Sequence, residues 1–255
     1  MVQPVSLAVL AHHIGEPRFE TYRELALNHN FDAVRLYRWN LEMSGALHEA
    51  LGLAEVFLRN AIDRELRVWN AAQPPRRGSP AYNAEWVKNP AGPLWALLNP
   101  PTRSASSNRF STYEDARKRA QKDLTERPLG HRRYGHPVDH DDLVAHMTFG
   151  TWKKLLAKRD YKAPSGIGPS GQRRLWNEAI VGAFPHHQSP AVIYYWVDRL
   201  HSLRNRVAHA EPLCEADVMS YHRTIVRLLR AMDPSLGQWF SGISRIPEVS
   251  RRRPM

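Results

Sequence analysis

Residues 32–69 read DAVRLYRWNLEMSGALHEALGLAEVFLRNAIDRELRVW, and this stretch decides the fold class. Its apolar residues recur three or four positions apart, as they do on one face of an α-helix. The stripe consists of Leu47, Leu51, Ala54, Leu58 and Ile62, widened at the side by Leu53, Val56 and Phe57. We therefore predict an all-α protein in which residues 32–69 form one long helix or two nearly collinear helices, central in the fold or at an interface.

A second apolar helix is predicted from about Pro190 to Ala210, because Ser189 is a typical N-cap and Pro212 forbids continuation. It ends in Leu203-Arg204-Asn205-Arg206-Val207-Ala208-His209-Ala210-Glu211-Pro212. The residues expected to be buried are Val192, Trp196, Leu200, Leu203 and Val207. At about 100° per residue, the opposite face carries Asp198, His201, Asn205 and His209, with Arg206 beside them and Arg204 on one flank.

The polar residues of this face suit cleavage of an RNA phosphodiester. Histidine exchanges protons near neutral pH, and the planar guanidinium of arginine matches phosphate oxygens. In RNA the 2′-hydroxyl is itself a nucleophile once a base removes its proton, so neither a metal nor an activated water is required. Asn205, one turn before His209, would orient the imidazole or the hydroxyl. The alternative is a solvated polar face that happens to contain a histidine.

The run from Arg204 to His209 resembles the Arg-x4-6-His signature of HEPN domains, and the bacterial Abi-like (abortive infection) proteins in particular. Three further stretches resemble that family, namely Leu36-Tyr37-Arg38-Trp39-Asn40-Leu41-Glu42, Glu55-Val56-Phe57-Leu58-Arg59-Asn60-Ala61-Ile62 and Thr148-Phe149-Gly150-Thr151-Trp152. Ala210 stands where the family often has a second histidine, so His209 is the only histidine left in the motif.

The resemblance implies a HEPN-type helical bundle that acts as a metal-independent endoribonuclease without a cofactor. It implies that Arg204 and His209 are the catalytic pair and that Asn205 is the polar residue following the arginine. We also predict that Arg206, beside them, contacts RNA. Family members are often homodimers whose two signatures meet at the two-fold axis. On one ideal helix Arg204 and His209 point about 140° apart, and a site shared by two subunits would bring such groups together.

The implied role is abortive-infection phage defence or a toxin–antitoxin pair, in which cleavage of cellular or phage RNA is restrained by an antitoxin protein or a small RNA. The principal alternative is a non-catalytic RNA-binding HEPN module, in which the same helix only grips phosphate. A third class is an interaction protein that dimerises through the long helix, although the basic charge would then have no clear purpose.

Two interpretations are open for Glu55, Arg59, Asp63 and Arg67, which follow one another at i,i+4 spacing with alternating charge. They form a chain of helix salt bridges worth about 0.3–0.5 kcal/mol each. Alternatively, as the resemblance suggests, Glu55, Arg59 and Asn60 lie beside the segment from Arg204 to His209 and orient it.

We predict a single domain over residues 1–255, with a long irregular proline-rich insertion at about 71–135 and a basic, flexible tail at about 241–255. In the insertion, Tyr82, Trp86 and Trp95 either stack on bases or pack the loop onto the bundle; the arginines nearby are Arg76, Arg77, Arg103 and Arg109. Further helices are predicted over 17–30, 113–124, 215–232 and from 139–142 to about 157, and a turn over 163–171.

Composition is consistent with an intracellular protein that binds nucleic acid. The formal net charge is +11 and the isoelectric point is near 10.1, which indicates a polyanionic partner, with nucleic acid the first candidate and an anionic membrane surface the second. The single cysteine, Cys214, excludes an intrachain disulfide and fits a reducing cytoplasm. Residues 5–11 are too short an apolar run to span a bilayer, so we expect no membrane anchor. The spacing of His131, His136, His140 and His146 matches no zinc motif, and we expect no metal site.

Overall fold

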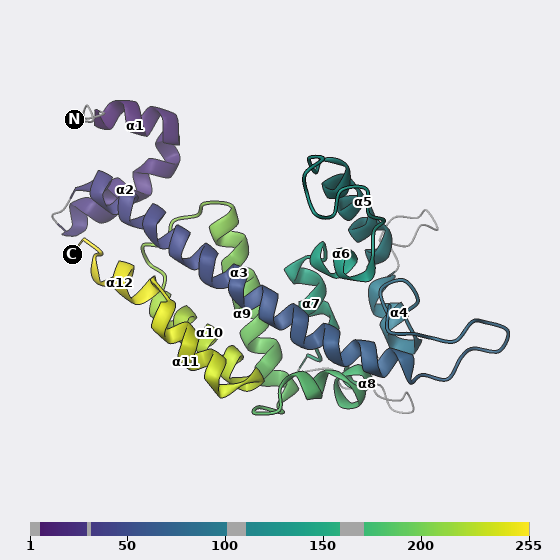
Figure 1. Cartoon of the computed structure of the whole chain (residues 1–255). Coiled ribbons are helices and arrows are strands. Elements are labelled where there is room, and N and C mark those ends of the chain that lie inside the picture. The colour runs from purple at the N-terminus through teal and green to yellow at the C-terminus, as the bar shows by residue number, and fades with distance from the viewer. Residues whose placement is uncertain (1–5, 30–31, 101–110, 159–170, 255) are drawn as a thin grey trace.

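The computed structural model describes residues 6–29, 32–100, 111–158 and 171–254 (Figure 1). These residues form twelve α-helices and one 3-10 turn, and no strand occurs among them. The prediction of an all-α protein is therefore confirmed for this part of the chain.

Helix α3, Ala33–Ala71, is the spine of the molecule (Figure 1). It is one continuous helix of 39 residues, which decides between the two alternatives for residues 32–69. The side chain of Asp32 caps it by accepting a hydrogen bond from the Val34 N–H at 2.8 Å. The predicted stripe Leu47, Leu51, Ala54, Leu58 and Ile62 is buried along its length. Helix α2, Glu16–His29, precedes it close to the predicted bounds, and α1, Leu7–Ile14, was not predicted.

Helix α9, Pro190–Ala208, packs on α3 and carries the predicted signature at its C-terminal end. Its buried residues are Ile193, Trp196, Val197, Leu200, Leu203 and Val207. The expected stripe thus holds except at Val192, which is only half-buried. Helix α10, Val218–Met232, then packs on both α3 and α9, and Asp233 is its C-cap, as the following Pro234 predicts.

The C-terminal segment is helical rather than a loose tail. Helix α11, Pro234–Ile243, folds back on α10, and α12, Ile246–Arg251, packs on α3. Ile246 and Val249 are buried, and the indole N–H of Trp39 donates to the Val249 carbonyl at 2.8 Å. These contacts correct the expectation of a flexible tail from residue 241. The segment ends in arginines, but Ile246 and Val249 before them pack into the core and hold it in place.

The proline-rich segment is also more regular than expected. Helix α4, Gly92–Leu98, and helix α5, Thr112–Thr125, interrupt it, the second close to the predicted bounds. The buried side chain of Asn70 holds the loop before α4, since it donates to the carbonyls of Asn83 and Asn89 and accepts from the Ala91 N–H. Arg103 and Arg109 lie outside the described residues.

The helix predicted from residues 139–142 to about 157 is two helices, α6, His140–Ala145, and α7, Phe149–Leu155. Asp139 caps the first in a capping box with Asp142. Thr148 then turns extended before α7, so that Met147, Phe149 and Trp152 all reach the core. Helix α8, Gly171–Glu178, and the 3-10 turn Ile180–Ala183 lead into α9. Of the predicted turn over 163–171, only Gly171 lies within the described residues.

Candidate functional site at the junction of α3, α7 and α9

The backbone that leaves α9 is clamped by residues from the N-terminal part of the chain. His209 is the C-cap of α9, and Ala210 has φ of 51°, in the left-handed region. Arg18 of α2 donates to the carbonyls of His209 and Ala210 at 2.6 and 2.9 Å. The buried amide oxygen of Asn40 accepts from the Leu213 N–H at 2.7 Å. Two distant helices therefore fix the end of the predicted signature.

Arg206 braces the same turn from within the signature. Its guanidinium pairs with Glu211 at 3.2 Å and donates to the Pro212 carbonyl at 2.9 Å. The residue predicted to contact RNA thus has intramolecular partners in this structure.

Arg204 lies on the exposed side of α9 and has no hydrogen-bond or ion-pair partner among the described residues. Its charge acts on Glu55 of α3. Burial raises the pKa of the Glu55 carboxyl above its ordinary value, against the opposing effect of Arg204 and then of Arg59. The structure therefore brings a half-buried carboxyl group and two guanidinium groups together where α9 packs on α3.

Only part of the predicted salt-bridge ladder on α3 forms. Arg67 pairs with Asp63 at 2.7 Å, and Asp63 also accepts from the Trp86 indole at 2.7 Å and contacts His140 at 3.1 Å. Trp86 is fully buried, so it packs the loop onto the bundle rather than facing solvent. Asp63 therefore joins α3, the loop that carries Trp86, and the start of α6.

Arg59 takes no part in that ladder. Its guanidinium makes only long contacts, 3.3 Å to the Asn60 side-chain oxygen and 3.5 Å to the Ala145 carbonyl. Asn60 is exposed next to it. The salt-bridge interpretation accounts for Asp63 and Arg67, and it leaves Glu55, Arg59 and Asn60 available for a site.

A second polar cluster adjoins Arg204 and was not predicted as a unit. The ammonium group of Lys153 on α7 lies 3.0 Å from Asp198 Oδ1 and 3.2 Å from His201 Nδ1. Since lysine only donates, Nδ1 accepts and the proton of the neutral ring is on Nε2. The helix periodicity predicted that Asp198 and His201 share one face. No nearby residue indicated that their partner would be Lys153, 45 positions before Asp198.

The surroundings of His201 favour its neutral form. Burial lowers the pKa of His201, and Lys153 and Arg204 lower it further, while Asp198 opposes them. Nε2 faces Gly150, where a Cβ atom would lie 3.3 Å from it, and the ring meets Phe149 edge-on at 5.9 Å. The stretch from Thr148 to Trp152 therefore packs against the His201 ring, and Gly150, which has no side chain, leaves room for it.

His209 stands apart from these groups. Its side chain is exposed and makes no contact with Arg204 within the described residues. Because the helix runs to Ala208, Arg204 and His209 are five positions apart on regular backbone, and they point about 140° apart. Asn205 lies half-buried between them and its carbonyl accepts from the His209 N–H at 3.0 Å. One chain thus joins Arg204 to Glu55, Arg59 and His201, and leaves His209 on a different side of α9.

Within the described ranges, no group of three or more histidine, cysteine, aspartate or glutamate side chains is placed to hold a metal ion. His140, one of the four clustered histidines, faces Asp63 instead. No helix among these residues is sufficiently long and apolar to cross a bilayer.

Comparison of the chain with protein-family models, with curated proteins and with solved structures gave no match.

Proposed function

We propose that this protein is a metal-independent endoribonuclease of the HEPN type. The observation that carries the proposal is the position of Arg204, an exposed arginine with no hydrogen-bond or ion-pair partner among the described residues, whose charge acts on the half-buried carboxyl of Glu55. An arginine whose N–H groups have no partner can donate hydrogen bonds to the oxygens of a phosphate. The formal net charge of +11 supports a polyanionic substrate.

In the proposed reaction the 2′-oxygen of a ribose attacks the adjacent phosphorus and the bond from phosphorus to the 5′-oxygen breaks. The products are a 2′,3′-cyclic phosphate and a 5′-hydroxyl. His209 takes the 2′-hydroxyl proton or supplies one to the leaving 5′-oxygen. Arg204 stabilises the charge that develops on the non-bridging oxygens. Asn205 positions either Arg204 or His209, and Glu55 orients Arg204.

We further propose that the active form is a homodimer. A single chain holds Arg204 and His209 on different sides of α9, and a two-fold axis at this helix end would combine one chain's arginine with the other's histidine. We also propose a role in phage defence or in a toxin–antitoxin pair, restrained by an antitoxin protein or a small RNA; the support for this role is the resemblance of the four sequence stretches to Abi-like proteins.

The first test is incubation of wild-type protein, Arg204→Ala and His209→Ala with total cellular RNA in excess EDTA, followed by mapping of the product ends. We expect cleavage by wild type that leaves cyclic phosphate or its hydrolysed form, reduced about 10²- to 10⁴-fold in the His209 variant, the usual worth of acid–base catalysis. Cleavage that persists in both variants would refute the assignment of these residues.

The dimer is tested in the same assay by mixing the two inactive variants. If the site combines groups from two chains, random exchange should restore about a quarter of wild-type activity, because half of the dimers are mixed and each holds one complete site. A mixture as inactive as its components would mean that each site is built within one chain.

The second candidate function is a non-catalytic RNA-binding module, and the separation of His209 from Arg204 favours it for a monomer. The EDTA assay distinguishes the two, because a binding module retains RNA without forming product. Binding that is unchanged in His209→Ala and lost in Arg204→Ala would then support the module.

A further inference from the structure

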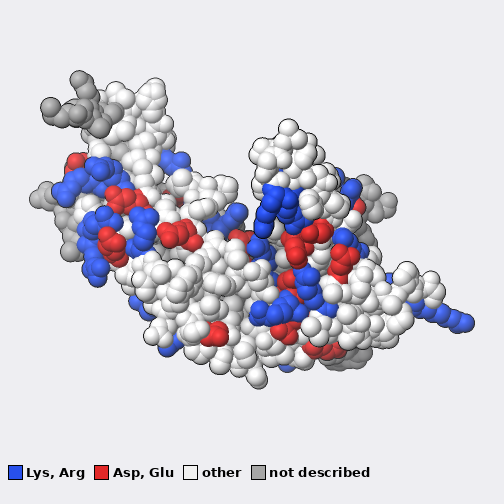
Figure 2. Space-filling view, in the orientation of Figure 1, with Lys and Arg blue, Asp and Glu red and all other residues white. Residues whose placement is uncertain are grey.

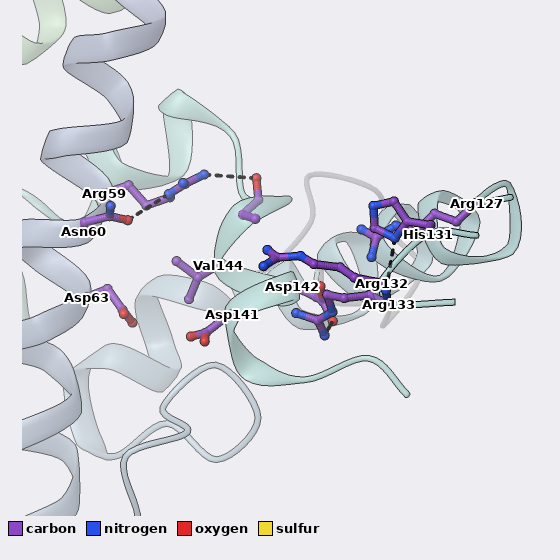
Figure 3. Close-up of a pocket in the computed structure, with 11 residues that line it drawn as sticks. Arg59, Asn60, Asp63, Arg127, His131, Arg132, Arg133, Asp141, Asp142 and Val144 are labelled. Atoms are coloured by element: carbon purple, nitrogen blue, oxygen red, sulfur yellow. Dashed lines mark hydrogen bonds and ion pairs between the residues drawn. The ribbon is translucent and has the colours of Figure 1, made fainter. Parts of the chain in front are cut away.

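A cleft lies between α3 and the segment that connects α5 to α6 (Figure 3). Its volume is about 410 Å³, and α3 forms one wall through Arg59, Asn60 and Asp63. The opposite side is lined by Arg127, His131, Arg132, Arg133, Asp141, Asp142, Val144 and Ala145. Arg59 belongs both to this cleft and to the group of charges around Glu55, so the cleft adjoins the proposed catalytic residues.

The carboxylates of the cleft are already neutralised by cations of the protein. Arg67 pairs with both Asp63 and Asp141, and Arg133 pairs with Asp142 at 2.7 Å. Asp142 is nearly buried and also accepts from the Asp139 N–H in the capping box. These acids organise the walls, and they leave little unbalanced negative charge to repel an anion.

The arginine donors of the cleft, in contrast, include some that make only long contacts and some that have no acceptor among the described residues. Arg59 makes only the two long contacts to Asn60 and Ala145. Arg132 has no hydrogen-bond or ion-pair partner among the described residues, and Figure 3 shows its side chain extending from the far wall toward α3. Arg127 pairs with Asp123, yet its other terminal nitrogen is buried without a partner. A ligand that only accepts hydrogen bonds and carries negative charge would satisfy these donors.

The position of the cleft fits a long ligand better than a small one. Figure 2 shows a hollow between the lobe that carries α1 and α2 and the lobe that carries α5, with Lys and Arg side chains on the wall of the second lobe. Figure 1 shows the C-terminal end of α9, the helix that carries Arg204, beside the same space.

We infer that this cleft binds a backbone phosphate of a single-stranded RNA between Arg59 and Arg132 and so feeds the strand to the Arg204 site. The inference rests on the proposed function for the identity of the strand. By this inference, the segment between α5 and α6 binds substrate, and the group that it recognises is a phosphate.

The test measures binding without cleavage. A fluorescein-labelled 2′-O-methyl RNA has no free 2′-hydroxyl, so its affinity can be followed by fluorescence anisotropy in EDTA over a range of NaCl concentrations. The variants are Arg132→Gln and, as a control with the same charge change, Arg227→Gln on the exposed side of α10. Thermal melting checks that both variants fold.

We expect Arg132→Gln to weaken binding about two- to tenfold, the worth of one hydrogen bond. It should also reduce the steepness of log Kd against log salt by about 0.7, the value for one single-strand phosphate contact. Arg227→Gln should leave both quantities at wild-type values. Equal Kd and equal salt dependence in the two variants would overturn the inference.

The outcome separates the cleft from the catalytic proposal. Wild type that cleaves RNA while Arg132→Gln binds as tightly as the control would refute the cleft and leave the nuclease standing. Loss of affinity in Arg132→Gln for a wild type that never cleaves would support the cleft and refute the nuclease.

Discussion

Glu55 is the residue on which the two arginines of the proposed site act. Its carboxyl is half-buried, so its charged form lacks full solvation, and Arg204 and Arg59 only partly compensate. The folded-state pKa is raised, hence folding favours the protonated form. The contribution of Glu55 to stability therefore declines as pH rises from its ordinary pKa of 4.5 through the folded value. At neutral pH the ionised carboxylate of Glu55 therefore lowers stability.

Replacing Glu55 with Gln tests that statement. The amide has the same shape and no charge to desolvate, so the melting temperature at pH 7 should be unchanged or higher. RNA cleavage should fall, because Arg204 loses the carboxylate that orients it. The measurements are thermal melting and the EDTA cleavage assay, with Glu248→Gln on the exposed side of α12 as the control. A lower melting temperature with intact cleavage would make Glu55 a structural residue.

At the scale of elements, the packing of α11 on α10 depends on one glycine. A Cβ at Gly237 would lie 2.2 Å from Arg230 Cγ and 3.0 Å from the Val226 carbonyl. Gly242, in the same helix, has open space at that position. The two glycines therefore separate the steric role of glycine from its low helix propensity.

Gly237→Ala should destabilise the protein by about 1–3 kcal/mol, the usual range for an overpacked contact. Gly242→Ala should instead stabilise it by about 0.5–1 kcal/mol, because alanine favours the helix. Urea unfolding followed by circular dichroism measures both. If the two substitutions shift the urea midpoint in the same direction, the close contact between α11 and α10 does not require glycine at position 237.

At the scale of the whole molecule, buried His222 and half-buried His201 make the fold sensitive to acid. Burial lowers the pKa of His222 and of His201 below the ordinary value of 6.5, with help from Arg223 in the first case and from Lys153 in the second. His222 stacks on Phe240 at 5.4 Å, and its Nε2 has no partner. Below pH 6.5 the unfolded chain binds these protons more readily than the folded one, so stability decreases as pH falls through the folded pKa values.

The melting temperature should accordingly drop between pH 7.5 and pH 5, and the drop should be smaller in His222→Gln, which cannot take up the proton. Exposed His186 supplies the control, since His186→Gln should retain the wild-type drop. Differential scanning calorimetry at several pH values makes the comparison. An identical drop in all three proteins would exclude His222 as a source of the acid sensitivity.

The long helices could be predicted from the sequence because periodicity and caps depend on residues within a few positions of one another. That information located α2, α3, α5, α9 and α10 close to their observed bounds. It failed for α1, α4, α8 and α12, which have six to eight residues, and for α11, which has ten. Helices this short are marginal in isolation and form through packing, so their local signals are weak.

The candidate site divides in the same way. The sequence by itself determined that Arg204, Asn205 and His209 occupy the end of one helix, and that Arg204 and His209 point apart, because helix geometry follows from local hydrogen bonds. Only the tertiary structure decided that Glu55 lies within the electrostatic reach of Arg204, that Lys153 contacts His201, and that Arg18 hydrogen-bonds the end of α9. Those contacts join residues far apart in the chain, and they form because burying the apolar stripes of α3, α7 and α9 against one another fixes where their polar faces meet.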